Sequence, residues 1–363
     1  MAVKTNKRSL FYTDKPLFGL DIGVSSIKVM QLHSSGKQTV VSGYGSIKFD
    51  PEAVVDGRIV KHEVLAKAMY ELFDKHIIGT IDTRRMAATV PASKAFTRIM
   101  TLPSNISHSE LDEAVRFEAE QYIPISLDDL YLDYSNIGQS VNSKEMSEIV
   151  VVAVPKKIVD SYIEFFDIVG LEPCALETTI TASSRLIGRA ENSAEIPTIL
   201  IDCGSVSVDL TIYDKSLIVN GTVPGGGDNF TERIAEHLHV SHQEATTIKY
   251  KYGIGFSKKQ KEISEAMRPQ LELLIKEIRR VIRYYDDRIQ NKSKIGQIIT
   301  MGGGANMPGF SDYLTDNLRI PTRMCDFWHK IDNGNITVPS IVERSTFVTV
   351  AGAALIKPKD IWR

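Results

Sequence analysis

Cysteine is scarce in this chain, with three residues in a total of 363. Cys174, Cys203 and Cys325 lie far apart, and no two of them have the short spacing of paired metal ligands. The sequence therefore supports neither a zinc site nor a disulfide framework. Free thiols in a chain of this length fit the reducing cytoplasm, which is the location we predict.

Long hydrophobic runs are also lacking. The longest, residues 149–154, is far shorter than the roughly 20 residues that cross a bilayer. The first 17 residues do not contain the apolar core of a signal peptide. We therefore expect no transmembrane segment, so that any association with a membrane would come through a partner.

A large net charge is absent as well, because 43 basic residues nearly balance 45 acidic ones. Without a basic field, the composition gives no reason to expect nucleic acid as a partner. Hydrophobic residues make up 43% of the chain, which is enough apolar surface for a folded core. The length suits two lobes of roughly 100 to 200 residues each.

What the chain does contain is a weak internal repeat. Residues 21–29 read DIGVSSIKV and residues 202–210 read DCGSVSVDL, with Asp, Gly and Ser at matching positions. Each copy follows a short apolar strand and leads into another, which predicts a β-hairpin with a Gly/Ser turn. Two similar lobes that face one another would bring these turns together.

Helix and strand patterns alternate along the rest of the chain. We expect helices at residues 64–74 and 156–169, and buried strands at residues 86–90, 148–154 and 297–301. Alternation of this kind is typical of an α/β architecture with mixed sheets.

A stretch of about 80 residues separates the strand at 86–90 from a helix expected to begin near Glu177. Inside this stretch, Ser107 and Glu110 have the spacing of a capping box, and the helix that they start must stop before Pro124. Its apolar positions are Leu111, Ala114, Val115, Ala119 and Tyr122. We interpret the stretch as a small appended subdomain.

A second long helix is predicted in the other lobe. Pro269 suits its first turn, and the pattern runs to about Arg288. Its apolar stripe, which we assign to the core and not to an interface, consists of Leu271, Leu274, Ile275, Ile278, Ile282 and Tyr285.

Three glycine-rich turns, at residues 21–28, 202–207 and 302–306, each follow a predicted strand. Glycine lets a backbone come close to a ligand so that N–H groups point at phosphate oxygens, and Ser hydroxyls add donors. Asp21 and Asp202 would face phosphates only with a cation between them, and Mg²⁺ prefers such a place. Either hairpin alone is better explained as a plain tight turn; the ordered set of three is far more specific.

That ordered set resembles the phosphate-1, phosphate-2 and adenosine motifs of the actin-like ATPase superfamily, which includes actin, Hsp70 and sugar kinases. The resemblance covers nearly the whole chain and implies a ribonuclease H-like fold, in which two lobes with a duplicated mixed-sheet core clasp ATP and Mg²⁺. Asp21 and Asp202 would hold the metal through water. The implied phosphate contacts are Gly23, Ser25, Ser26 and Lys28 from the first lobe and Gly204, Ser205 and Ser207 from the second.

The same resemblance implies further contacts to the nucleotide. The adenosine turn would consist of Gly302, Gly303, Gly304 and Asn306. Gly226 and Gly227 would approach the phosphates, although ordinary helix capping explains that glycine run equally well. Lys249 matches the lysine of a Glu-x-x-Lys ribose motif, but Thr246 replaces its glutamate.

Glu177 corresponds to the residue that orients the attacking water in Hsp70-type proteins, with a plain carboxylate at a helix start as the alternative. No general base is evident beside it, so we expect ATP binding and, if hydrolysis occurs at all, a slow rate.

The appended stretch decides which branch of the superfamily the chain resembles. Residues 118–124 and 151–155 are similar to the 1C subdomain shared by FtsA and PilM proteins. FtsA ends in an amphipathic membrane-targeting helix, for which residues 357–363 are too short. The chain therefore resembles the PilM family of type IV pilus assembly proteins most. An FtsA-like cell-division protein and a related secretion-system subunit stay open as alternatives, and a metabolic kinase is less favoured because no sugar-pocket motif is present.

Membership of the PilM family would imply a location in the cytoplasm, peripheral to the inner membrane through a partner. That partner is the cytoplasmic N-terminal peptide of a PilN-type membrane protein, bound in a groove between subdomains 1A and 1C. Leu111, Val115 and Tyr122 are candidates for the groove, the alternative being that they pack on their own sheet. A pilus motor ATPase, a platform protein and self-association are open as further contacts.

The expected domain boundaries follow from these assignments. Residues 1–92 begin the first lobe, and residues 93–172 form the inserted 1C-type subdomain. Residues 173–196 contain the interdomain helix, residues 197–340 form the second lobe, and residues 341–363 return to the first lobe as a helix.

Overall fold

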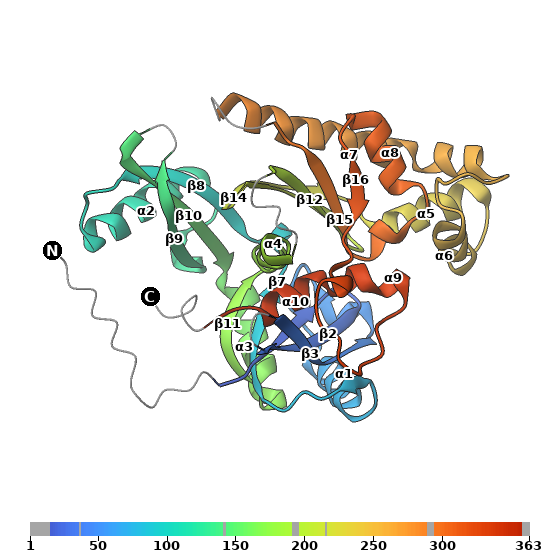
Figure 1. Cartoon of the computed structure of the whole chain (residues 1–363), viewed down its shortest axis with the longest axis horizontal. Helices are drawn as coiled ribbons and strands as arrows, with labels where there is room; N and C mark the ends of the chain where they lie inside the picture. The colour runs from blue at the N-terminus through green and yellow to red at the C-terminus, as the bar shows by residue number, and fades with distance from the viewer. Residues whose placement is uncertain are drawn as a thin grey trace.

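The computed structural model describes residues 15–35, 38–140, 143–190, 196–214, 216–288 and 294–357. The first 14 residues and the last six, which belong to the terminal segments discussed above, lie outside this description. Figure 1 shows a first lobe around β1, β2 and β3, a second lobe around β12 and β15, and an appended subdomain around β8, β9 and β10. Among the described residues, no helix combines the length and the apolar character needed to cross a membrane.

The first lobe is built on a six-stranded sheet in the order β11-β7-β1-β2-β3-β6. Strands β1, β2 and β3 form an antiparallel meander, and β7 and β11 continue the sheet in parallel with β1. The predicted first hairpin is confirmed. The strand bounds are Phe18–Ile22 (β1), Ser26–Ser35 (β2), Gln38–Lys48 (β3), Ile77–Gly79 (β6), Arg85–Val90 (β7) and Glu172–Thr178 (β11).

The second lobe repeats this topology. Its sheet has the order β14-β13-β12-β15-β16, with an antiparallel meander on one side and two parallel strands on the other. Both the second predicted hairpin and the buried strand at residues 297–301 are confirmed. The bounds are Thr198–Cys203 (β12), Ser207–Asp214 (β13), Ser216–Pro224 (β14), Gln297–Met301 (β15) and Thr322–Met324 (β16).

Two predicted helices cover one face of the first sheet, and both are confirmed: α1 (His62–Lys75) and α3 (Lys156–Val169). Between β3 and α1, the short strands β4 (Val54–Val55) and β5 (Arg58–Ile59) pair with each other. The sequence analysis grouped α3 with the insertion. Its buried side chains at i, i+4 and i+8 pack instead into the first-lobe core, because this stripe faces the sheet. These side chains are Ile158, Tyr162 and Phe166.

The appended subdomain is a compact unit of its own. Strands β8 (Phe96–Pro103), β9 (Leu130–Ser140) and β10 (Ser143–Pro155) form an antiparallel sheet in the order β8-β10-β9, and α2 (His108–Tyr122) packs on it. The predicted capping box is confirmed, since Ser107 Oγ accepts from the Glu110 amide and the Glu110 carboxylate accepts from the Ser107 amide. The compact unit therefore ends at Pro155, before α3.

Four helices cover the second lobe: α5 (Gly227–Leu238), α6 (His242–Lys251), α7 (Gln260–Arg288) and α8 (Phe310–Leu318). The prediction that Pro269 opens a helix is wrong, because Pro269 lies inside α7. The helix continues upstream because Ile263 and Met267 extend the buried stripe, which compensates for the backbone hydrogen bond that proline removes. The assignment of the downstream stripe to the core is confirmed.

Two helices lie between the lobes, α4 (Thr179–Ala190) and α10 (Val348–Ala354), the latter preceded by α9 (Ile341–Arg344). In Figure 1 they cross at the centre of the molecule. Their approach requires glycine: a Cβ on Gly352 would collide with the Ala182 carbonyl oxygen, and one on Gly19 of β1 with the Val350 carbonyl oxygen. Backbone contact on both sides therefore fixes α10 between β1 and α4.

Candidate functional site

The turn of the first hairpin carries an acidic and a basic side chain in direct register. Asp21 on β1 pairs with Lys28 on β2, and Lys28 Nζ lies 3.8 Å from Asp21 Oδ2 and 3.0 Å from Ser26 Oγ. Thr89 on β7 donates to Asp21 Oδ1 at 2.7 Å. The Lys28 side chain is only 15% exposed, so it is not a solvent-facing strand lysine.

The second hairpin breaks this symmetry. At the position that corresponds to Lys28 stands Asp209, which lies directly opposite Asp202 in the β12–β13 register. Burial and the neighbouring carboxylates of Asp209 and Asp21 raise the pKa of Asp202 to about 7. Burial raises the pKa of Asp209 to about 6, although Thr222 Oγ1 donates to its carboxylate at 2.6 Å. Two carboxyl groups that face each other repel when both are ionised, so a nearby cation would stabilise the pair.

Asp209 is a site residue that the sequence analysis missed. The signal was available, because residues seven positions after the two repeat aspartates are Lys28 and Asp209. Behind the pair lies a cavity of about 10 Å³, which has room for roughly one water molecule. Asp202, Asp209, Thr211 and Ser183 are among the residues that line it.

The two hairpins face each other across the lobes. The charges of Asp21 and Lys28 both act on the Asp202 carboxyl, the first raising and the second lowering its pKa. Among the residues that the structure describes, no group of three His, Cys, Asp or Glu side chains is arranged to hold a metal ion. Mg²⁺ usually binds through one or two carboxylates and completes its shell with water and phosphate oxygens.

The glycine run at residues 225–227 contacts the second hairpin turn through its backbone. The Gly227 amide donates to Gly204 O at 2.9 Å, and the Asp228 amide donates to Ser205 O at 2.9 Å. A Cβ on Gly226 would collide with Gly204 O. The approach of Gly226 and Gly227 to phosphate stays a prediction; the Gly227 N–H group itself has a protein acceptor.

In the first hairpin turn, too, a glycine N–H group already has an acceptor within the protein. The Gly23 amide donates to Ser26 O at 2.9 Å, which closes the turn. A Cβ on Gly23 would come no closer than 3.5 Å to Ser26 O, so the turn depends on this backbone hydrogen bond and not on the lack of a side chain. The predicted phosphate contacts that still carry side-chain donors at the two turns are Ser25, Ser26, Lys28, Ser205 and Ser207.

The predicted adenosine turn follows β15 directly. Gly302 has a φ of 82°, and a Cβ there would collide with Asp202 Oδ1, so this turn lies against the second hairpin. Gly303 to Asn306 form a 3₁₀ turn that contains Gly304, and a Cβ on Gly303 would meet no atom within 4 Å. Asn306 Nδ2 donates to Ser345 Oγ at 3.0 Å, which ties the turn to the segment before α10.

Lys249 is buried inside the second lobe. Its ammonium donates to Gly227 O and to Thr231 Oγ1, both at 2.6 Å, and burial lowers its pKa. Lys249 therefore stabilises the first turn of α5, directly after the glycine run, through these two hydrogen bonds. A ribose contact by Lys249 stays a prediction.

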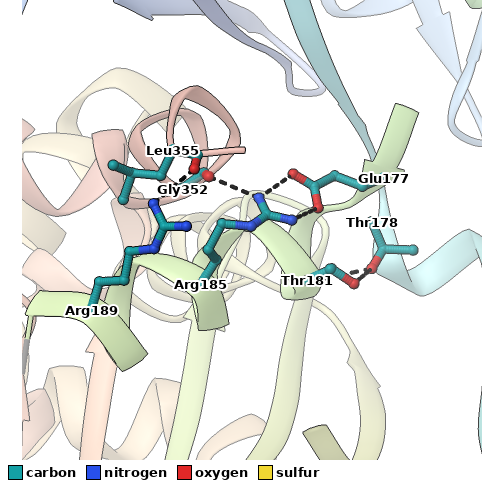
Figure 2. A network of polar contacts seen from close by, with 7 residues as sticks. All are labelled: Glu177, Thr178, Thr181, Arg185, Arg189, Gly352 and Leu355. Atoms are coloured by element: carbon teal, nitrogen blue, oxygen red, sulfur yellow. Dashed lines mark hydrogen bonds and ion pairs between the residues drawn. The ribbon is translucent and has the colours of Figure 1, made fainter. Parts of the chain in front are cut away.

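Glu177 does not begin a helix as expected. It lies in β11, which stays paired with β7 through Thr178, and α4 starts one residue later. Figure 2 shows its carboxylate held by the Arg185 guanidinium, with nitrogen–oxygen distances of 2.6 and 2.5 Å. Arg185 also donates to Gly352 O at 2.9 Å. The Glu177 carboxylate thus joins β11 to α4 and α10, and water orientation by Glu177 stays a prediction.

The three candidates for the partner groove lie in the core of the appended subdomain. Val115 has no exposed surface, and the partly buried Leu111 and Tyr122 pack in the same cluster. The Arg98 guanidinium lies 4.7 Å from the centre of the Tyr122 ring. The alternative, packing on their own sheet, is what the structure shows, because the α2 stripe at i and i+4 faces the sheet.

The carboxyl pair predicts how stability depends on pH. Asp202 and Asp209 bind protons more tightly in the folded chain than in the unfolded one, where the pKa is about 3.9. Their contribution to the free energy of unfolding is therefore full below about pH 4 and is lost as the pH rises through about 7. We expect Asp209→Asn to raise the melting temperature of the ligand-free protein at about pH 8, by an equivalent of about 1–3 kcal/mol.

Thermal unfolding of the wild type and of this variant between about pH 5 and pH 8 measures the effect. Asp316→Asn on the exposed side of α8 is the matched control and should follow the wild type. Parallel pH curves for wild type and Asp209→Asn would show that the pair carries no proton in the folded state.

Comparison with known proteins identifies the family. The model of a protein family described as "Type IV pilus assembly protein PilM" matches residues 19–356. A solved structure described as a PilM-PilN type IV pilus biogenesis complex aligns with a TM-score of 0.81 at 22% identity, over 97% of this chain and 100% of the other. Two others share the fold. The ethanolamine utilization protein EutJ from Carboxydothermus hydrogenoformans has a TM-score of 0.56 at 15% identity, over 95% and 90% of the two chains.

MreB 5 of Spiroplasma citri, solved with AMPPNP, has a TM-score of 0.51 at 13% identity, over 94% and 95% of the two chains. The predicted actin-like fold is thus confirmed, including the duplicated mixed sheets. Since the family match spans nearly every described residue, this chain belongs to the PilM family of type IV pilus assembly proteins.

Proposed function

We propose that this type IV pilus assembly protein binds ATP with Mg²⁺ between its two lobes. It also binds the cytoplasmic N-terminal peptide of a PilN-type membrane protein next to its appended subdomain. The family match favours this function over the FtsA-like, secretion-system and kinase alternatives. The nucleotide would act as a ligand that sets the position of the lobes, and the peptide would bring the protein to the inner membrane.

The observation that carries the nucleotide site is the convergence of Asp202 with Asp21 and Lys28 from the opposite lobe. Carboxylates from two lobes, with a lysine beside them, suit a cation between protein and phosphate oxygens. When bound, Mg²⁺ would supply positive charge to the carboxyl pair and the phosphates. Lys28 would neutralise phosphate charge, and the Ser25, Ser26, Ser205 and Ser207 hydroxyls would donate to phosphate oxygens.

Turnover is expected to be slow. The carboxylate predicted to orient water, that of Glu177, is held by Arg185 and lies in β11. We expect steady-state phosphate release well below about 1 s⁻¹, the low end of the usual enzyme range. A phosphate-release assay at saturating ATP measures this rate, and a value above that limit would require a different catalytic carboxylate.

The peptide site is proposed at the junction of β9 and α3, in place of the three buried candidates. Strand β9 is the outer strand of its sheet, and such an edge can pair with an extended peptide. Tyr131 on β9 is 49% exposed, and its hydroxyl donates to Asp160 on α3 at 2.9 Å. Ile163, one turn further along α3, is 37% exposed. Together they offer apolar contacts beside the edge strand.

We expect Tyr131→Ala with Ile163→Ala to weaken binding of a labelled N-terminal peptide from the PilN-type partner by about tenfold or more, because buried aromatic and aliphatic anchors dominate such contacts. Fluorescence anisotropy measures the affinity. Ile341→Ala, at an apolar site on α9 that is 68% exposed and lies outside the subdomain, is the control and should bind like the wild type.

A deletion separates this site from the nucleotide site. Phe96 and Ala153 are paired at the base of the subdomain, so replacing residues 97–152 by a short glycine turn spares α3 and the fully buried first-lobe core, and removes only the partly buried Val152 from its rim. This variant should keep stabilisation by Mg²⁺–ATP and lose the peptide. Peptide binding that survives the deletion would place the partner elsewhere.

A further inference from the structure

A basic tip lies where α6 ends and α7 begins. The stretch of residues 245–261 contains five lysines and no acidic residue. Lys249 is buried, whereas the other four are exposed. Phe256, at the centre of the stretch, is fully exposed. A fully exposed aromatic side chain, close in the sequence to four exposed lysines, is a candidate for an interaction surface. The four exposed lysines are Lys251, Lys258, Lys259 and Lys261.

An acidic end lies on the outer face of α2. Glu113, Phe117 and Glu120 follow each other at spacings of four and three residues, so they share one helix face, opposite the buried Val115 and Ala119. Phe117 is 65% exposed. Glu110, Asp112 and Glu118 are exposed on the same helix, and Arg116 is its one exposed basic residue.

The two surfaces are complementary but distant. Figure 1 shows α2 and α6 at opposite ends of the long axis, so the acidic end cannot reach the basic tip of its own molecule. Each surface has an exposed phenylalanine near exposed charges that are mostly of one sign, and the prevailing signs are opposite. The acidic end of one molecule fits the basic tip of the next.

We propose that copies of this chain associate head to tail, with the outer face of α2 on one molecule docked against the tip around Phe256 on another. Such a contact uses two different surfaces, so it is heterologous, and repetition gives an open row of molecules. Charge pairing makes the association sensitive to salt. The exposed side chains that would pair are Glu113, Phe117 and Glu120 on one copy with Phe256, Lys258 and Lys259 on the other.

A second copy explains both surfaces at once. An anionic membrane would attract the lysine tip, but it would repel α2 and leave Phe117 without a partner. The proposal is independent of the nucleotide and peptide sites, since none of its residues belongs to either. Stabilisation by Mg²⁺–ATP therefore serves as a check that each variant is folded.

Charge reversal at either end tests the proposal. Glu113→Lys with Glu120→Lys makes both ends basic, whereas Lys258→Glu with Lys259→Glu makes both ends acidic. Sedimentation velocity over about 1–100 µM protein follows the mass. The wild-type mass should rise with concentration and fall with added salt. Each reversal should weaken association by about tenfold or more.

Restoration separates head-to-tail docking from other effects of charge. A mixture of the two reversed proteins should associate again, and so should one chain that carries all four substitutions. A wild-type protein that stays monomeric over the whole range, or reversed proteins that do not restore association on mixing, would overturn the proposal. Anionic phosphatidylserine vesicles that bind the wild type but not the acidic-tip variant, with self-association unchanged by both reversals, would assign the tip to lipid instead.

Discussion

Mg²⁺–ATP is expected to raise the melting temperature of the wild-type protein and to leave that of Asp202→Asn unchanged. A ligand that binds only the folded state stabilises it by about 2.7 kcal/mol at a hundredfold excess over its dissociation constant. Asn keeps the shape of the side chain but removes the charge that a cation between the hairpins requires. Differential scanning fluorimetry with and without Mg²⁺–ATP measures the shift.

Asp202→Asn should remove the stabilisation by Mg²⁺–ATP without lowering the stability of the ligand-free protein. Loss of the shift could then not be attributed to unfolding of the variant. Without ligand, the variant should be at least as stable as the wild type at about pH 8, because a buried carboxyl pair is relieved of its repulsion. Lys28→Met should also lose the shift, since it removes the cation beside Asp21. Asp316→Asn should keep it. Equal shifts in wild type, Asp202→Asn and Lys28→Met would place the nucleotide outside the cleft.

Gly352→Ala is expected to destabilise the protein by about 3 kcal/mol or more, since the added methyl group collides with backbone that cannot move aside. The Cβ position overlaps the carbonyl of Ala182 in α4, and Arg185 holds the Gly352 carbonyl from the same helix. In Figure 2 the Arg185 and Arg189 side chains both point at the end of α10. To accept the methyl group, α10 would have to move away from α4, and its close backbone contact with Gly19 of β1 restricts that movement.

Chemical denaturation gives the free energy of unfolding for this comparison. Gly303→Ala makes the same chemical change where a Cβ meets no atom within 4 Å, so its stability should match the wild type. If Gly352→Ala is too unstable to be measured, Arg189→Gln is the second test. This variant removes the donor to Leu355 O and should lose part of the free energy of unfolding. Wild-type stability in both variants would mean that α10 is not clamped between the lobes.

Local patterns in the sequence were sufficient for most of the secondary structure. The α3 helix and β15 strand have the predicted bounds, because an apolar stripe at i and i+4 and a short apolar run ended by glycine are both strong signals. The capping box at Ser107 was readable for the same reason, since its two hydrogen bonds lie within four residues. Pro269 favours a helix start, but α7 begins upstream of it because the buried side chains there stabilise the helix more than the proline destabilises it.

The sequence by itself determined the family, the two Asp-Gly hairpins and the glycine turn after β15, because each of these depends on residues close together in the chain. Only the tertiary structure decided how the site is charged and which candidates are free to act. Asp209 faces Asp202 through strand pairing, Glu177 is taken up by Arg185, and Val115 is enclosed by its own sheet. The burial of the carboxyl pair and the contacts of Glu177 and Val115 arise only when the elements pack against one another, so no local pattern revealed them. The position of Asp209 opposite Asp202, by contrast, could be read from the repeat.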